Sequence, residues 1–152
     1  MFESSSGRFA CSFNGHVNWV RGTALNRDTT LAVTGSDDKT VKLWDVATHK
    51  CRHTFYEHNR YLYICRFIEP LFALCSAHAC LLACSAVSAV AFHPQGTVIA
   101  AAGDDGCIKL WDLRSNRLIQ HYSAHSAGVT SISCHPSGDF LLSSSNDGSL
   151  KV

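Results

Sequence analysis

Charged residues are scarce in this sequence, and the two signs nearly cancel. Asp, Glu, Lys and Arg make up 16% of the 152 residues, whereas an average soluble domain has roughly 25%. The formal net charge is +1 with histidine neutral. Such a chain has no basic surface to attract a nucleic-acid backbone or an anionic membrane. We therefore expect no nucleic acid among its partners.

Secretion signals are absent as well. Residues 1–7 contain neither a basic start nor an apolar stretch, and the sequence has no Asn-x-Ser/Thr sequon. Half of the eight cysteines lie between Cys65 and Cys84, while the others occur singly in strand-like segments. This distribution does not suggest a disulfide framework. It favours free thiols in the reducing cytoplasm.

Motifs for catalysis are also missing. No Gly-x-Ser-x-Gly elbow, phosphate-binding loop or zincin helix occurs. Two acidic pairs, Asp37–Asp38 and Asp104–Asp105, lack the spacing of a calcium loop, and adjacent side chains in a strand or turn point apart. We predict that the chain is not an enzyme and has no cofactor, no metal site and no small-molecule substrate.

What the sequence does contain is an internal repeat. Three histidines each stand three residues after an aromatic residue, and a Trp-Asp pair begins 14 residues before two of them. The runs between these marks alternate in polarity, as in Val87–Phe92, and turns such as Pro94-Gln-Gly separate them. Short strands without a helical period predict an all-β fold. The marks are His16, His58 and His125, together with Trp44-Asp45 and Trp111-Asp112.

The order of these marks resembles the WD-repeat family, whose members are β-propellers built from four-stranded blades. The resemblance covers nearly everything outside residues 60–84. It implies a partial propeller of about three blades, in a ring that is not closed, with one irregular apolar insertion. The expected organisation is a disordered N-terminus (1–7), the last strand of a preceding blade with a first repeat (8–58), an insertion (59–85), a second repeat (86–125) and a truncated third repeat (126–152).

The resemblance further implies a buried polar network in every blade, joining a turn aspartate, a histidine, a Ser or Thr hydroxyl and the tryptophan N–H. Its role is packing, and each member left unpaired would cost roughly 1–3 kcal/mol. In the second blade Ala101 and Gly103 occupy the hydroxyl positions, so that network is expected to be incomplete. In the third blade the tryptophan would fall one position after Val152. The network residues are His16, Asp38, Trp44 and either Thr34 or Ser36 in the first blade, His58, Asp105 and Trp111 in the second, and His125, Asp147 and either Ser143 or Ser145 in the third.

The stretch 59–85 breaks the repeat, because Trp44 and Trp111 are 67 residues apart where the repeat predicts 42. We interpret the 25 extra residues as an apolar insertion from a retained intron or a faulty gene model, since the excess is one in-frame block. Two alternatives remain open. One is a transmembrane span over 71–92, which would absorb a predicted strand. The other is a zinc site whose spacing matches no familiar finger, with Cys75, His78, Cys80 and Cys84 as ligands.

Within the family, several stretches resemble the proteome-of-centriole WD-repeat proteins, which are cytoplasmic components of the centriole and the basal body. This resemblance implies a non-catalytic scaffold for centriole assembly or stability and for cilium formation, with centriolar or cytoskeletal proteins as partners. The outer blades and the C-terminal coiled coil of that subgroup are missing. The alternatives are a generic WD-repeat adaptor, such as a ubiquitin-ligase substrate receptor or a signalling scaffold, and a membrane-anchored variant. The stretches are His16–Arg21, Ser36–Asp45, Ile99–Gly103, Arg117–Tyr122 and Ala124–Ala127.

The resemblance also indicates where partners bind, since propellers commonly use the face that carries the turns before the third strand of each blade. Trp19 and Arg21 are candidates near the start of a blade. Asp37, Asp104 and Asn146 are candidates because each directly precedes a turn aspartate. For these three the alternative is plain solvation of a turn, and Trp19 could equally belong to the core.

Overall fold

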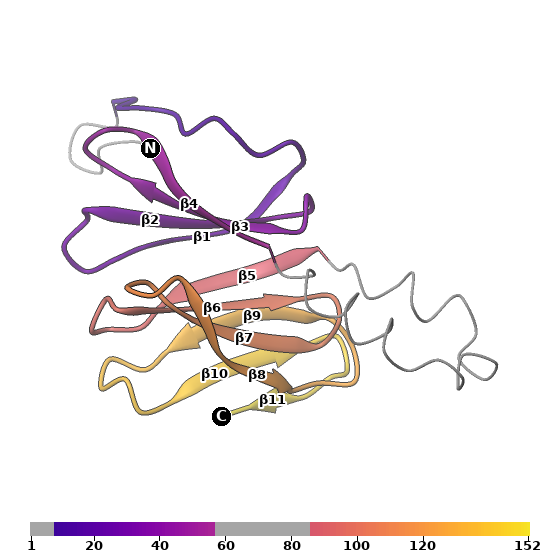
Figure 1. Cartoon of the computed structure of the whole chain (residues 1–152). Helices are drawn as coiled ribbons and strands as arrows, with labels where there is room; N and C mark the ends of the chain where they lie inside the picture. Colours follow the sequence, from indigo (N-terminus) through magenta and orange to yellow (C-terminus); the bar gives the residue numbers. More distant parts are fainter. Residues whose placement is uncertain (1–7, 57–85) are drawn as a thin grey trace, which may run out of the picture.

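The computed structural model describes residues 8–56 and 86–152, and in these ranges it contains β-strands and no helix. The strands form three antiparallel sheets in which neighbours in sequence are hydrogen-bonded neighbours (Figure 1). The first sheet contains β1 (Val20–Leu25), β2 (Leu31–Ser36), β3 (Thr40–Asp45) and β4 (Lys50–Tyr56). The second contains β5 (Val87–Phe92), β6 (Val98–Gly103), β7 (Cys107–Asp112) and β8 (Arg117–Ser123). The third contains β9 (Val129–Cys134), β10 (Leu141–Ser145) and β11 (Leu150–Lys151).

Tight turns between the second and third strands set the register of each sheet. The N–H of Gly106 donates to Gly103 O, and the N–H of Gly148 donates to Ser145 O, both at 3.2 Å. The two turn glycines have left-handed backbones, with φ of 73° and 78°, which glycine adopts without steric cost. In the first sheet Lys39 takes the same position at φ 69°. These turns therefore lie where the Asp-Gly and Asp-Lys pairs of the sequence place them.

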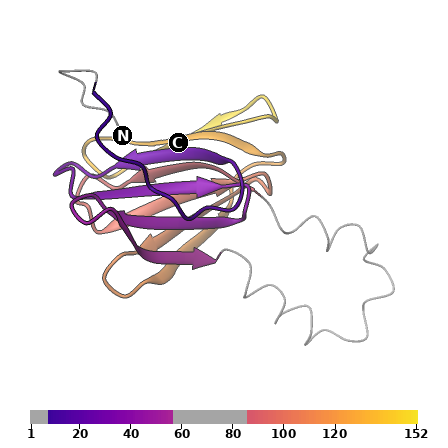
Figure 2. The same ribbon diagram turned by 90° about the horizontal axis from the view of Figure 1, so that it is seen from above.

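The three sheets are stacked with their first strands side by side (Figure 1). β1 packs against β5, and β5 packs against β9. Seen from above, the first sheet overlies the other two (Figure 2). Glycines permit the close approach of β1 and β2 to β5: a Cβ on Gly22 would lie 3.0 Å from the Cα of Ala89, and one on Gly35 would lie 2.9 Å from a methyl group of Val90. The stack thus has the arrangement of successive propeller blades.

The interior between the first two sheets is apolar and closely packed. The Phe55 ring of β4 lies 5.2 Å from the Trp111 ring of β7, at a tilt of 45°. A second apolar cluster joins the second sheet to Val129 and Ile132 of the third. Because alternate residues of a strand point to opposite faces, the period-two pattern of the sequence accounts for this packing. The buried residues between the first two sheets are Val33, Val41, Leu43, Phe55, Val87, Val90, Ile99, Ala101 and Trp111.

The predicted fold class is confirmed: the described residues form an all-β, open stack of three sheets, which is a partial propeller. The third sheet has three strands in the described residues, and the last of them, β11, has two residues. Among residues 8–56 and 86–152, no helical segment has the length and apolarity of a membrane span. The predicted disordered start (1–7), the insertion (59–85) and the four alternative zinc ligands lie outside the described residues.

Residues 8–14, expected to be the last strand of a preceding blade, form no ladder. Phe9 is a single bridge residue, and the rest of the segment is coil. The segment instead packs on the first sheet, where the Phe13 ring lies 5.6 Å from that of Trp44 and Cys11 is buried. This contact matches the one between Phe55 and Trp111.

Candidate functional site

A continuous chain of hydrogen bonds runs through the first sheet. Asp38 Oδ2 lies 2.7 Å from His16 Nδ1, and His16 Nε2 lies 2.6 Å from Thr34 Oγ1. The Trp44 indole N–H donates to the same Thr34 oxygen at 2.8 Å. Because an ionised carboxylate can only accept, the hydrogen bond to Asp38 requires a proton on His16 Nδ1. The chain thus links Asp38, His16, Thr34 and Trp44 in one network.

Asp38 anchors this chain at the β2–β3 turn. Its side chain is 5% exposed, and it accepts hydrogen bonds from the Thr40 hydroxyl at 2.6 Å and from the Val17 N–H at 3.1 Å. Burial alone would raise the pKa of Asp38, but the bonds from Thr40, His16 and the two backbone N–H groups outweigh it and lower the pKa to about 2. The carboxylate therefore stays ionised at neutral pH and locks the turn.

The third sheet repeats the arrangement. Asp147 Oδ2 lies 3.1 Å from His125 Nδ1, and His125 Nε2 lies 2.9 Å from Ser143 Oγ. The Ser149 hydroxyl donates to Asp147 Oδ1 at 2.6 Å. This bond is the main reason why the pKa of Asp147 is lowered; burial opposes it, and N–H groups and His125 reinforce it. Ser143 thus occupies the place that Thr34 has in the first sheet.

Of the two hydroxyls that the sequence offers in each blade, the structure brings Thr34 and Ser143 to the histidines. Ser36 and Ser145 bind the turns instead. The Ser36 hydroxyl accepts the N–H of Asp38 at 3.1 Å and donates to Asn18 O at 3.3 Å. Ser145 accepts the N–H of Asp147 at 3.2 Å and donates to Gly128 O at 2.9 Å.

The second sheet departs from this scheme. Ala101 stands where Thr34 stands in the first sheet, and the buried indole N–H of Trp111 has no hydrogen-bond partner among the described residues. His58 lies outside the described residues. Asp105 accepts the Cys107 N–H at 3.0 Å, and its carboxylate lies 3.7 Å from the Lys109 ammonium. The sequence analysis did not anticipate Lys109, whose side chain is 4% exposed.

The networks combine an acid, a histidine and a hydroxyl, the set that serine hydrolases use. Their surroundings do not suit that chemistry, because a nucleophile must reach the substrate. The Thr34 oxygen is engaged by Trp44, and Ser143 is 3% exposed. In the part of the chain that the structure describes, no three His, Cys, Asp or Glu side chains gather as metal ligands do. The networks are therefore structural.

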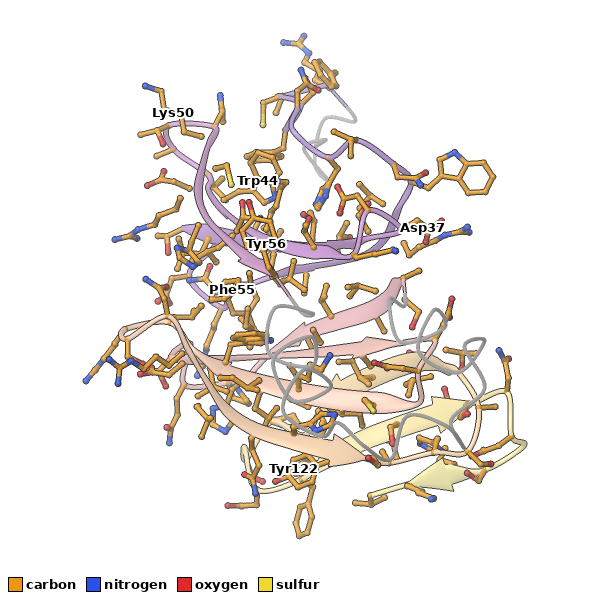
Figure 3. The ribbon with its side chains drawn as sticks, turned by 45° about the vertical axis from the view of Figure 1, so that its right-hand side comes forward. Asp37, Trp44, Lys50, Phe55, Tyr56 and Tyr122 are labelled. Carbon is orange, nitrogen blue, oxygen red and sulfur yellow. The ribbon has the colours of Figure 1, made fainter. Side chains whose placement is uncertain are left out.

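The turns held by these networks meet at one end of the stack. In each sheet, the N–H of the residue before the turn aspartate donates to a carbonyl at the start of the first strand. The donor and acceptor are Asp37 and Trp19 at 2.9 Å, Asp104 and Ala86 at 3.1 Å, and Asn146 and Gly128 at 3.0 Å. Figure 3 shows Asp37 at this end of the first sheet, away from Lys50. We call this end, with Val17, Trp19, Arg21, Asp37, Asp104 and Asn146, the turn face.

Trp19 and Arg21 form a preassembled pair on the turn face. The Arg21 Nε donates to both carboxylate oxygens of Asp37, at 3.0 and 2.9 Å, and Nη2 donates at 2.7 Å. The guanidinium carbon lies 4.7 Å from the centre of the Trp19 ring. The hydrogen bond to Asp37 is the main cause that raises the pKa of Arg21; slight burial opposes it, and the charges of Asp37 and Asp104 add to it. Trp19 is nevertheless 70% exposed, whereas Trp44 is 1% exposed.

The structure therefore places all five predicted partner-binding residues on one surface, and Trp19 belongs to that surface rather than to the core. The sequence analysis missed the stacking of Arg21 on Trp19 and the exposure of Val17. A signal for the first existed, because residues two apart in an extended segment share a face.

Comparison with known proteins agrees with this architecture. The chain matches the model of the family described as WD domain, G-beta repeat, over residues 7–45, 69–112 and 116–152. It is 26% identical to Pre-mRNA-processing factor 19 homolog 2 of Arabidopsis thaliana, over 86% of this chain and 29% of that protein. It is 30% identical to CCR4-associated factor 4 homolog of Vanderwaltozyma polyspora, over 86% of this chain and 18% of that protein. It is 28% identical to Mitochondrial division protein 1 of Kluyveromyces lactis, over 84% of this chain and 18% of that protein.

The chain spans less than a third of the length of these relatives. The matched segments nevertheless include strands of all three sheets, and two of the sheets carry the same Asp–His–hydroxyl network. WD repeats are generally non-catalytic and mediate contacts between proteins. From the matched repeats and the stack of blade-like sheets, we conclude that the chain belongs to the WD domain, G-beta repeat family.

Proposed function

We propose that this chain is a non-catalytic scaffold that binds other proteins through the turn face, and that it does so at the centriole and the basal body. The observation that carries the first part is the exposed Trp19, held in place by Arg21 and Asp37. Trp and Arg are enriched among the residues that dominate binding at protein interfaces. A rigid pair of this kind loses little conformational entropy when a partner binds.

The buried networks support this use of the surface. Asp37 precedes Asp38, whose ionised carboxylate is held by His16, Thr40 and the Val17 N–H. The turn that carries Asp37 therefore has one conformation, and so has the guanidinium that Asp37 binds. The arrangement prepares a surface for contact with a partner.

The centriolar part of the proposal rests on the stretches that resemble the proteome-of-centriole WD-repeat proteins, above all His16–Arg21 and Ser36–Asp45. Both stretches contribute residues to the turn face. The relatives named above carry names from pre-mRNA processing and mitochondrial division, so family membership alone does not select an assembly. We propose the centrosome and basal body, within the cytoplasm, as the location.

The test is to express the tagged chain in ciliated cells, beside a Trp19→Ala variant and a Phe140→Ala control. Phe140 is also exposed, at 59%, but lies in a different turn, between β9 and β10. We expect centrosomal foci for the wild type and the control, and loss of foci for Trp19→Ala. Folded wild-type protein that stays diffuse would refute the centriolar location. If it also captured ubiquitin-ligase or signalling subunits in a Trp19-dependent manner, the generic adaptor would be the better account.

A further inference from the structure

We propose that the segment bound at the turn face is a basic peptide, with one Lys or Arg side chain stacked on the open face of Trp19 and its charge directed to Asp104. This inference rests on the proposed binding function of the turn face and specifies the partner's chemistry. It follows from the shape of the surface, from its charge and from the state of the indole ring.

The shape is uneven along the three sheets. Trp19, Ala86 and Gly128 are equivalent, because each carbonyl accepts the N–H that precedes a turn aspartate. A single large side chain is therefore followed by two small ones. A Cβ on Gly128 would lie 3.1 Å from the Cα of Asp104, so the second sheet's turn closes directly onto this backbone. Trp19 is thus the one large side chain among these three equivalent positions, and it is exposed.

The charge of this end is negative. The three turns contain five carboxylates, against four cations at this end, which are Lys39 in a turn and Arg21, Lys109 and Lys151 beside the turns. Arg21 pairs with Asp37, while networks hold the turn aspartates. Asp104 is exposed and makes no ion pair or side-chain hydrogen bond with any described residue, yet it lies close enough to Arg21 to raise the pKa of that group. One carboxylate at the surface is thus left for a partner's cation.

The indole itself favours a cation. The ring faces of tryptophan carry negative electrostatic potential and attract Lys and Arg. Arg21 occupies one position over the ring, and the ring is still 70% exposed. The long aliphatic stem of Lys or Arg can cover apolar surface while the charged head stays at the carboxylate. An acidic segment would meet the opposite condition, because the carboxylate of Asp104 would repel it.

The experiment uses the full chain with a fluorescent label on an array of random heptapeptides whose central residue is Arg, Lys, Gln or Glu. We expect Arg and Lys peptides to bind at least about tenfold more strongly than Gln peptides, with Glu peptides weakest. Trp19→Ala should weaken the affinity for the Arg and Lys peptides at least about tenfold, as expected for a residue that dominates an interface. Asp104→Asn should reduce the difference in affinity between the Arg and Gln peptides. Asp104→Lys should shift the binding preference toward the Glu peptides.

Two variants outside the turn face serve as controls. Asp28→Asn removes an exposed carboxylate from the β1–β2 turn, and Phe140→Ala removes an exposed ring from the β9–β10 turn. Both should bind as the wild type does. Equal binding of Arg, Gln and Glu peptides that is still lost in Trp19→Ala would overturn the basic partner and leave the turn face as a binding surface. Binding that Trp19→Ala does not change would overturn both proposals.

Discussion

Replacing Thr34 by valine tests the network of the first sheet with little change in shape. Valine keeps the β-branched volume but removes the hydroxyl that joins His16 at 2.6 Å and Trp44 at 2.8 Å. Two buried polar groups, His16 Nε2 and Trp44 Nε1, then lose their partner. Each such loss costs roughly 1–3 kcal/mol, so the free energy of unfolding should fall by about 2–6 kcal/mol. That is a large part of the roughly 5–15 kcal/mol by which a typical domain is stable.

Thr34→Ser is the matched control, because it keeps the hydroxyl and removes one methyl group. It should cost only about 1 kcal/mol. Urea unfolding of the full chain, followed by circular dichroism, gives both values. In a double-mutant cycle, Thr34→Val should cost less when Trp44 is already phenylalanine, because no indole N–H is then left unpaired. Equal stability of the valine and serine variants would refute the reasoning.

Three further predictions concern the networks and turns. The pKa of Asp38 is about 2 in the folded chain, below the ordinary aspartate value of 3.8, so its contribution of roughly 2 kcal/mol to the free energy of unfolding is present above pH 3.8 and lost as the pH falls through 2. Unfolding measured from pH 2 to pH 5 should show this loss, and Asp38→Asn should flatten the pH dependence. Gly106→Ala should destabilise more than Gly96→Ala although both glycines have φ near 72°, because a Cβ at Gly106 would press on backbone carbonyls and one at Gly96 would meet nothing within 4 Å. The free energies of unfolding of the two variants, measured with urea, should differ by more than about 1 kcal/mol, and equal values would contradict the packing. Ala101→Ser should raise the free energy of unfolding by about 1 kcal/mol by giving the Trp111 N–H an acceptor, and no change would show that this N–H is already satisfied.

The strands and turns of the described residues were predictable because their signals are local. The alternating run at Val87–Phe92 became β5, and Asp105-Gly106 became the β6–β7 turn. Repetition strengthened each local signal, since the same order of marks recurs in every sheet. The fold class followed from these two properties alone.

The choice between Thr34 and Ser36 could not be made from the sequence. The two residues stand two positions apart on β2 and so share a face of the strand. Which one meets His16 depends on the path of residues 14–19, which no periodic pattern describes. The irregularity in the β1–β2 pairing between Val20 and Gly22 belongs to the same stretch. The choice of Thr34 over Ser36 is therefore set by the tertiary structure and not by the strand pattern.

Two other features also escaped prediction. Lys109 is buried beside Asp105, although a lysine in an alternating strand ordinarily indicates the solvent face. Residues 8–14 carry the pattern of a last strand, yet apart from the bridge at Phe9 the segment is coil. In both cases the outcome depends on which sheet lies next to the residue, and that information is not local.

Nitrogen chemical shifts of the imidazole rings test the central claim most directly, because the account requires a defined protonation state for the histidine of each network. The ¹⁵N spectra should show that His16 and His125 carry a proton on Nδ1, the nitrogen that faces Asp38 and Asp147. Spectra in which both rings carry the proton at Nε2, as free imidazole side chains prefer, would contradict the account.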